Sequence, residues 1–328
     1  MQTSDVELPA QKRQISLGPG LTSPYATNAQ KPSVLDKDLV PSRLKALWSE
    51  VEAGRLTTEE FCAHERELIR CYAEIWADAL LLPGEHDLQR SVCVELGNLV
   101  GSDDLADIER KCRSALHDMR DQWNAEVKKG DVIETLNYYD KSSHYSYELM
   151  WWHSLVHDQS PLAYVVALHL ALQNGFKDSL DFGSGVGSGG LLFSKHGFSI
   201  SLGDVSSALL DFSRRRLQAR GAPATYIDLK TTELPAGQYD FITAMDVFEH
   251  IAEPEKAVEP LARALRPGGI LFGRLNAKPD EDHPSHITYD FAPAFKRLTE
   301  LGLEKCWRDE WLWGHQAFRK APRAVGSC

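Results

Sequence analysis

The stretch DSLDFGSGVGSGGLLFSKHG, residues 178–197, decides the fold. Small and apolar residues lead into a turn made mostly of glycine, and a helix-like pattern follows. Glycine lets the backbone pass close to a ligand because no Cβ atom stands in the way. In a doubly wound α/β sheet, such a turn lies beyond the carboxyl end of a strand, where ligands bind. The stretch therefore predicts a strand, a ligand-binding turn and a helix.

The rest of the C-terminal part continues this pattern. Short β-rich runs alternate with helix-like segments, and these runs are SLDF, SISLGD, ATYIDL, DFITAM and GILFGRL. Such alternation is typical of a parallel sheet covered by helices on both faces. The last stretch, LEKCWRDEWLWGHQAFRK, holds two β-like runs with no helix between them, which indicates an antiparallel hairpin. We predict an α/β, Rossmann-like sheet over residues 176–328, mostly parallel and closed by that hairpin.

Two different segments precede this sheet. Residues 41–175 are predicted to be almost wholly helical, and Thr57 with Glu60 offers a capping box ahead of a long amphipathic run. Residues 1–40 are rich in Pro, Ser, Thr, Gln and Gly, which favours a disordered tail. The chain thus divides into a tail, an all-helical domain that we expect to form a lid over the ligand site, and the sheet domain.

Composition narrows the class of ligand and the compartment. The net charge of −11 disfavours binding to nucleic acid or to an anionic membrane. No apolar run approaches the length of a membrane span, and the first forty residues lack the apolar region of a signal peptide. Six cysteines without a C-x-x-C pair indicate reduced thiols in a cytoplasmic protein. We therefore expect a small-molecule partner, and the sequence is compatible with a homo-oligomer.

Acidic residues at two strand ends indicate which ligand the turn holds. The dinucleotide fingerprint G-x-G-x-x-G is matched by Gly185, Gly187 and Gly190, so a nicotinamide-dependent oxidoreductase is one alternative. However, Asp181 opens the pattern D-x-G-x-G-x-G, and its carboxylate would attract an ammonium group and repel a pyrophosphate. Asp204 ends the next strand, where it can accept hydrogen bonds from both ribose hydroxyls. Adenosine joined to an amino acid without phosphate describes S-adenosylmethionine.

Residues 177–319 resemble the class I S-adenosylmethionine-dependent methyltransferases. The resemblance lies in segments that occur in family order: LDFGSGVGSGG, LGDVS, YIDL, YDFITAMDVFEHI and LRPGGILFGRL. It implies a methyltransferase with S-adenosylmethionine as cofactor; the further alternative is a methyltransferase-like protein that binds without catalysis. The resemblance also implies cofactor contacts: the methionine part at Gly183, Ser184, Gly185 and Gly187, the ribose at Asp204, the adenine at Asp228 or Leu229, and the sulfonium side at Met245 and Asp246.

An aromatic tract at 137–161 is the expected cover of the acceptor site. We predict that Tyr139, Tyr145 and Trp152 line a pocket for the acceptor and that His153 takes part in catalysis. Aromatic rings beside a sulfonium suit a flat or apolar acceptor and provide cation–π contact. The alternative is that these rings only pack the helical domain on the sheet. The tract weakly resembles one in sterol, cyclopropane and polyprenyl-type C-methyltransferases.

A second cluster of candidate residues follows the fourth strand. Wound as a helical turn, Asp246, Glu249 and His250 would share one face, and His286 comes from a later loop. The segment resembles ubiquinone-pathway O-methyltransferases, and Glu-x-x-Glu-His metal sites occur in those, so a divalent ion on these four residues is an alternative. Here the first acid is Asp, and the same letters are widespread in metal-free relatives. We favour His250 and His286 as bases or acceptor-orienting groups. The acceptor's identity, and whether C, N or O is methylated, stay open.

Overall fold

The computed structural model describes residues 38–128, 131–142, 144–156, 160–278 and 283–322. Its centre is a seven-stranded sheet of order β3-β2-β1-β4-β5-β7-β6. The strands are β1 (Asp178–Phe182), β2 (Ser199–Asp204), β3 (Ala224–Asp228), β4 (Tyr239–Ala244), β5 (Leu265–Gly273), β6 (Leu303–Arg308) and β7 (Gln316–Lys320). Strands β1 to β5 are parallel, and β7 is antiparallel to both β5 and β6. The predicted parallel sheet and C-terminal hairpin are confirmed.

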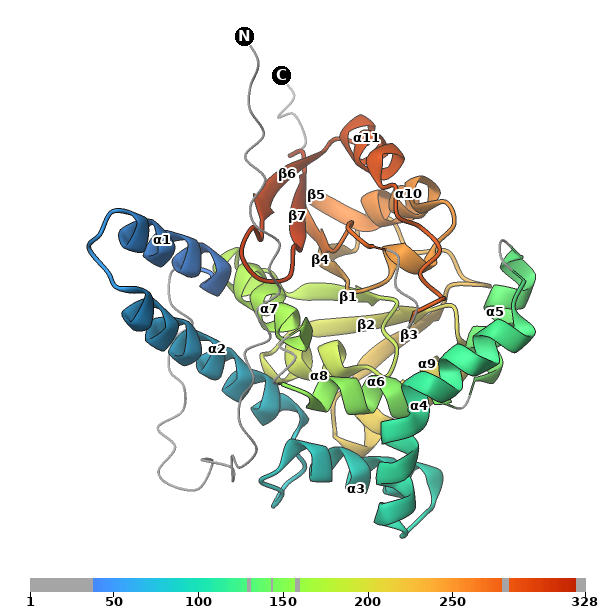
Figure 1. Ribbon diagram of the computed structural model, residues 1–328. Coiled ribbons are helices and arrows are strands. Elements are labelled where there is room, and N and C mark those ends of the chain that lie inside the picture. The colour runs from blue at the N-terminus through green and yellow to red at the C-terminus, as the bar shows by residue number, and fades with distance from the viewer. Residues whose placement is uncertain (1–37, 129–130, 143, 157–159, 279–282, 323–328) are drawn as a thin grey trace.

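Helices pack on both faces of the sheet. They are α7 (Ala163–Gln173), α8 (Ser188–Lys195), α9 (Ser207–Ala219), α10 (Pro254–Ala264) and α11 (Ala292–Glu300). Figure 1 shows α10 and α11 together on one face and α7 and α8 on the other. Alternation along the strands separates the two cores, since Phe241 and Phe272 pack with the α7 and α8 side, whereas Ile242 and Leu271 pack with the α10 and α11 side.

The part before the sheet is helical, as predicted. Its helices are α1 (Val40–Glu52), α2 (Thr58–Leu80), α3 (Leu88–Val100), α4 (Leu105–Glu126), α5 (Val132–Lys141) and α6 (His144–Ser154). The capping box is present, because Glu60 N donates to Thr57 Oγ1 (3.2 Å) and Thr57 N donates to Glu60 Oε2 (2.8 Å). Helix α1 begins at Val40, inside the stretch assigned to the tail. Residues 1–37 of that tail lie outside the described residues.

Helix α7 links the helical part to β1 and is surrounded by protein. Every residue from 163 to 171 is buried, including His169, whose Nδ1 lies 2.7 Å from the Tyr72 hydroxyl of α2. A helix that is apolar on all sides belongs inside a core. The same core holds side chains of α1, α2, α8 and the sheet. The helical part and the sheet therefore share one hydrophobic core.

A buried ion cluster makes a second connection between these parts. Glu95 of α3 accepts from Nε of Arg216 on α9 (3.0 Å) and from Nη1 of Arg220, the residue that follows α9 (2.9 Å). Glu95 is 4% exposed and Arg216 is fully buried. Arg220 also donates to the carbonyls of 79, 80 and 81, at distances of 3.0, 2.9 and 2.9 Å, which satisfies the end of α2. Figure 1 shows α1 to α5 as an arc beside the sheet.

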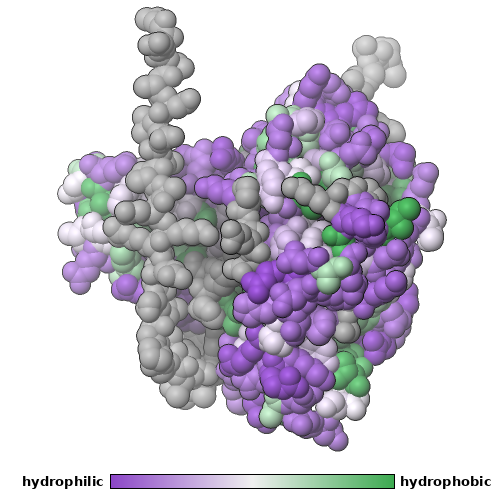
Figure 2. Space-filling model, turned by 45° about the vertical axis from the view of Figure 1, so that its right-hand side comes forward, coloured by the Kyte–Doolittle hydropathy of each residue, from purple (hydrophilic) through white to green (hydrophobic). Residues whose placement is uncertain are grey.

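The outer surface is largely polar. Figure 2 shows a mostly hydrophilic face with apolar residues in small separate patches. In the part of the chain that the structure describes, the exposed large apolar side chains are Val100, Ile133 and Tyr289. Among the helices of the described ranges, none combines the length and the apolar character needed to cross a membrane.

Candidate active site

The glycine turn after β1 has the geometry that its sequence predicts. Gly183, Gly185 and Gly187 have φ angles of 73°, 51° and 76°, a region that favours glycine. A Cβ atom on Gly183 would lie 2.4 Å from Val247, and one on Gly185 would lie 2.8 Å from Leu149. The turn is thus packed between the loop after β4 and helix α6, and it has no room for side chains.

Asp181 offers an unsatisfied carboxylate oxygen beside this turn. Its Oδ1 accepts from Thr243 Oγ1 (2.7 Å), with the Tyr164 hydroxyl 3.5 Å away. Its Oδ2, like the nearby Ser184 Oγ, is buried and has no hydrogen-bond partner among the described residues. Burial raises the pKa of Asp181 to about 7, and the Asp204 carboxylate adds to this shift. Buried polar atoms almost always have a partner, so this pair fits a ligand that brings an ammonium group.

Asp204 at the end of β2 is tied to the same turn. Its Oδ2 accepts from Gly185 N (2.8 Å) and its Oδ1 from Ser206 N (2.8 Å). A carboxylate oxygen has two lone pairs, so each can still accept from a ribose hydroxyl. Burial raises the pKa of Asp204, and the backbone hydrogen bonds from Ser206 and Gly185 oppose that shift. The residues fit the ribose of the predicted cofactor.

The end of β3 lies next to Asp204. Asp204 pairs with Asp228 in the strand register, which places the two acids side by side at the carboxyl edge. Asp228 Oδ2 accepts from Ser207 Oγ (3.0 Å), and the Leu229 side chain would contact a Cβ placed on Gly203 (3.4 Å). Asp228 is half-buried. This placement is consistent with the predicted adenine position.

The segment after β4 differs from the predicted helical turn. Met245 is 7% exposed, and Asp246 has a φ of 50°, which a non-glycine residue rarely adopts. Only Phe248–His250 forms a helical turn, and it is a 3-10 turn, so Asp246 stands outside it. The predicted helical turn through Asp246, Glu249 and His250 is wrong, because the left-handed backbone at Asp246 interrupts it.

A guanidinium group joins the two acids instead. Arg274 Nη2 lies 2.7 Å from Asp246 Oδ1 and 2.7 Å from Glu249 Oε1. Glu249 is fully buried, and its other oxygen has no hydrogen-bond partner within the described part of the chain. Arg274 was not predicted, since nothing in the run GILFGRL marks its arginine as a partner of the acids after β4. It supplies the positive charge that these carboxylates need.

His250 faces the aromatic tract and the later loop. Its Nδ1 lies 3.1 Å from the Tyr139 hydroxyl and 3.1 Å from the carbonyl oxygen of Ser285. A carbonyl oxygen only accepts, so Nδ1 carries the hydrogen and Nε2 keeps its lone pair. Burial lowers the pKa of His250 to about 4, so the ring is neutral near pH 7. The His286 ring (4.8 Å between centroids) completes this group, which the sequence predicted.

The predicted aromatic wall divides into two groups. Tyr139 and Tyr145 have ring centroids 5.5 Å apart and lie with His250. Trp152 packs on His153 (5.0 Å), which is 5% exposed and whose Nδ1 forms a hydrogen bond with Ser188 Oγ (2.9 Å). Burial lowers the pKa of His153 to about 3, and Arg216 adds to that shift. These contacts place His153 at the start of α8, away from His250. His157 of the same tract lies outside the described residues.

Sequence reasoning missed Glu148 on α6. Its side chain keeps accessible surface, although burial raises its pKa to about 7 and Asp246 adds to the shift. The available signal was a single acid within an aromatic tract. Glu148 therefore lies close enough to Asp246 for the two carboxyl groups to interact.

Three side chains lie close enough together to bind a metal ion, but Arg274 already contacts one of them. One ligand atom each from Glu249, His250 and His286 lies within 4.8 Å of the others. Arg274 already forms ion pairs with Glu249 and Asp246, and its charge would repel a cation there.

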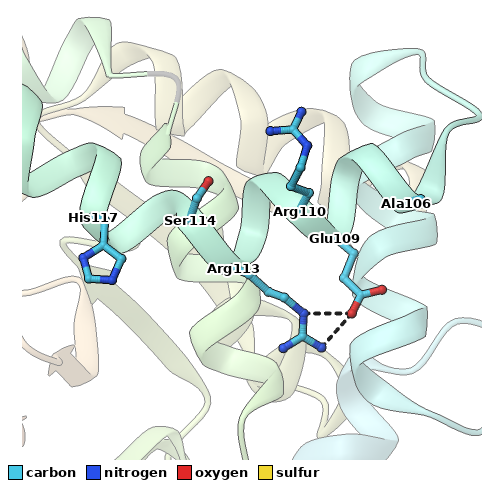
Figure 3. Close-up of a pocket in the computed structure, with 6 residues that line it drawn as sticks. All are labelled: Ala106, Glu109, Arg110, Arg113, Ser114 and His117. Carbon is cyan, nitrogen blue, oxygen red and sulfur yellow. Dashed lines mark hydrogen bonds and ion pairs between the residues drawn. The ribbon is translucent and has the colours of Figure 1, made fainter.

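A separate hollow lies on α4. It measures about 560 Å³ and is lined by Ala106, Glu109, Arg110, Arg113, Ser114 and His117, all from this one helix (Figure 3). Arg113 pairs with Glu109 (2.6 Å) and stacks over Trp151. These contacts give the Arg113 guanidinium partners within the protein. None of the predicted site residues lines the hollow.

Comparison with known proteins identifies the central segment. Residues 180–273, from β1 to the end of β5, match the methyltransferase domain family. Residues 180–273 form a methyltransferase domain. The seven-stranded sheet with its antiparallel C-terminal strands is the fold of class I S-adenosylmethionine-dependent methyltransferases. The predicted resemblance is confirmed.

Two relatives that match the methyltransferase domain are named as methyltransferases of ubiquinone biosynthesis and of demethylmenaquinone. A ubiquinone biosynthesis O-methyltransferase of Coxiella burnetii is 32% identical over 101 residues, 29% of this chain and 42% of the relative. A demethylmenaquinone methyltransferase of Thermus thermophilus is 32% identical over 109 residues, 32% of this chain and 50% of the relative. The chain thus spans half or less of the length of these relatives. A methyltransferase structure from Leishmania major covers 61% of this chain and 90% of its own, with 20% identity and a TM-score of 0.46.

Proposed function

We propose that the protein is an S-adenosylmethionine-dependent methyltransferase that acts on a small molecule. The observation that carries the proposal is the glycine turn between two buried acids, with Asp181 Oδ2 and Ser184 Oγ unpartnered. A nicotinamide dinucleotide would bring a pyrophosphate to this turn, next to Asp181. The names of the quinone-pathway relatives support a small-molecule acceptor, and one of them is named an O-methyltransferase. The methylated atom stays open.

The residues of this chain have distinct roles in cofactor binding. When bound, S-adenosylmethionine supplies a methyl group on a cationic sulfur. Asp181 and Ser184 bind its amino-acid group, Asp204 its ribose, and Asp228 with Leu229 borders its adenine. Met245 and Asp246 line the sulfonium side. The closed turn and the α6 cover exclude water, which strengthens these charge interactions.

A second set of residues orients the acceptor. Tyr139 and Tyr145 provide the aromatic wall, and His250 Nε2 accepts a proton from an acceptor hydroxyl or amine. His286 orients His250 through ring contact. His153, with Trp152 beside it, positions α6 on α8 through Ser188. Helices α1 to α6 form the acceptor lid in this proposal. The cysteines of the described ranges are free thiols, which supports a cytoplasmic location.

Calorimetric titration of Asp181→Asn tests the cofactor assignment. The amide keeps the hydrogen bond from Thr243 but loses the charge, so S-adenosylhomocysteine should bind at least tenfold more weakly. Asp178→Asn is the matched control, because Asp178 lies at the other end of β1 and pairs with Arg266 (2.7 Å). Equal affinity for both variants refutes the assignment. Binding of NADH without a response to S-adenosylhomocysteine overturns the proposed function.

A further inference from the structure

His315 stands at the edge of the sheet that carries the cofactor site. It directly precedes β7, whose residue Gln316 pairs with Gly273 at the end of β5. Because β7 is antiparallel to β5, its first residue lies at the carboxyl edge of the parallel strands. Arg274 follows Gly273 there, and it contacts Asp246 after β4 (2.7 Å). His315 is thus a neighbour of the acceptor region although it is distant in sequence.

The imidazole of His315 is buried without a hydrogen bond. The side chain is 2% exposed and its ring stacks on Phe272, with centroids 5.5 Å apart and planes at 12°. Neither Nδ1 nor Nε2 has a hydrogen-bond partner among the described residues, and the same holds for Gln316 Oε1. Leaving a buried polar group without a hydrogen-bond partner destabilises a protein. Two such atoms on one ring indicate a partner that the chain itself does not provide.

The surrounding charges restrict what that partner is. Burial lowers the pKa of His315 to about 4, with Asp246 and Arg274 acting in opposite directions. A neutral imidazole offers one N–H donor and one lone pair. The guanidinium of Arg274 is outnumbered by the carboxylates of Asp246 and Glu249, so a carboxylate or phosphate would meet net repulsion. An uncharged hydroxyl group both donates and accepts, and it fits this set.

We propose that His315 is an acceptor-binding residue that receives an uncharged hydroxyl group of the methyl acceptor at the start of β7. This inference rests on the proposed function and adds a recognition group to it. It places the polar end of the acceptor against His315 and Arg274, and its apolar part against Tyr139 and Tyr145. The hydroxyl that His315 binds defines the orientation of the acceptor and need not be the methylated atom.

Fragment binding to the full chain loaded with S-adenosylhomocysteine tests the proposal. The probes are phenol and cyclohexanol, each paired with its methyl ether, and benzoate. We expect wild type to bind one hydroxylated probe about fivefold to tenfold more tightly than its ether, as for one hydrogen bond. In His315→Phe, which keeps the stack on Phe272, this preference should fall to about one. In His315→Gln, which keeps a donor and an acceptor, part of it should return.

A measurement on wild type keeps the test valid if His315→Phe folds poorly. Long-range ¹H–¹⁵N spectra should show the His315 nitrogens shifting with a hydroxylated probe and not with its ether. An unchanged hydroxyl preference in His315→Phe refutes the proposal, and so does tighter binding of benzoate or failure of every hydroxylated probe to bind. Calorimetry with S-adenosylhomocysteine distinguishes failure of the His315 proposal from failure of the proposed function. If wild type does not bind S-adenosylhomocysteine, the proposed function is refuted.

Discussion

Arg216 and Arg220 bind the same acid but only Arg216 reaches the glycine turn. Arg216 Nη1 donates to the carbonyl of Val186 (3.0 Å) and to Ser188 Oγ (2.8 Å), and its Nε donates to Glu95 (3.0 Å). Arg220 instead donates to Glu95 and to the last carbonyls of α2. The two arginines therefore form a matched pair for asking whether the helical part positions the cofactor turn.

We predict different effects of replacing each arginine by methionine. In Arg216→Met, Glu95 keeps Arg220 as its counter-charge, so the loss of stability should stay near the lower end of the range for a broken buried ion pair, about 3 kcal/mol. The turn also loses both anchors. A charged hydrogen bond contributes about 2 kcal/mol. If half of that free energy, about 1 kcal/mol, is lost from cofactor binding, the Kd of S-adenosylhomocysteine rises about fivefold. Arg220→Met should lower stability similarly and leave this Kd unchanged.

Urea denaturation gives the two stabilities, and isothermal calorimetry below the unfolding transition gives the two affinities. A Kd that is unchanged in Arg216→Met, or raised equally in both variants, would refute the reasoning. In the first case the turn holds its shape without Arg216. In the second case the affinity only follows stability.

Other predictions concern the cofactor, pH and metal. Asp204→Ala should weaken S-adenosylmethionine binding by about 1.5–3 kcal/mol, and calorimetry that finds equal affinity contradicts the ribose assignment. Burial raises the pKa of Glu148 to about 7, so it is protonated below that pH and ionised above it. The affinity ratio of S-adenosylmethionine to S-adenosylhomocysteine, which differ in the sulfonium charge, should then rise from pH 6 to pH 8. A flat ratio, or one that is the same in Glu148→Gln, counts against a Glu148 charge that acts on the sulfonium. After dialysis against chelator we expect full activity, whereas lost activity that a divalent ion restores would establish the metal alternative on Glu249, His250 and His286.

Local sequence signals predicted the fold and the position of two acids beside the glycine turn. The glycine turn needs positive φ angles, and the capping box joins residues only three apart, so both are visible in short stretches. Asp181 and Asp204 were predicted because parallel strands bring their carboxyl ends to one edge. The position of each acid follows from the strand pattern alone.

The parts that sequence reasoning missed depend on distant pairing. Glu95 and Arg216 are 121 residues apart, and nothing near either one indicates the other. Arg274 meets Glu249 across 25 residues, and His315 reaches the edge of the site only through the antiparallel register of β7. The helical turn at Asp246 was predicted wrongly because periodicity does not reveal a left-handed backbone angle.

The burial of α7 on all sides has a consequence for how this protein can be divided. If the sheet were produced without α2, Tyr164 would lose the Trp76 ring that stacks on it (5.5 Å between centroids). Apolar surface along α7 would then be exposed to water. Because both parts contribute to one core, we expect a single cooperative unfolding transition. Exchanging the helices for those of another methyltransferase to alter the acceptor would therefore mean rebuilding the interior around Trp76 and Tyr164. Replacing the helices that we propose as the acceptor lid would therefore also change the thermodynamic stability of the sheet.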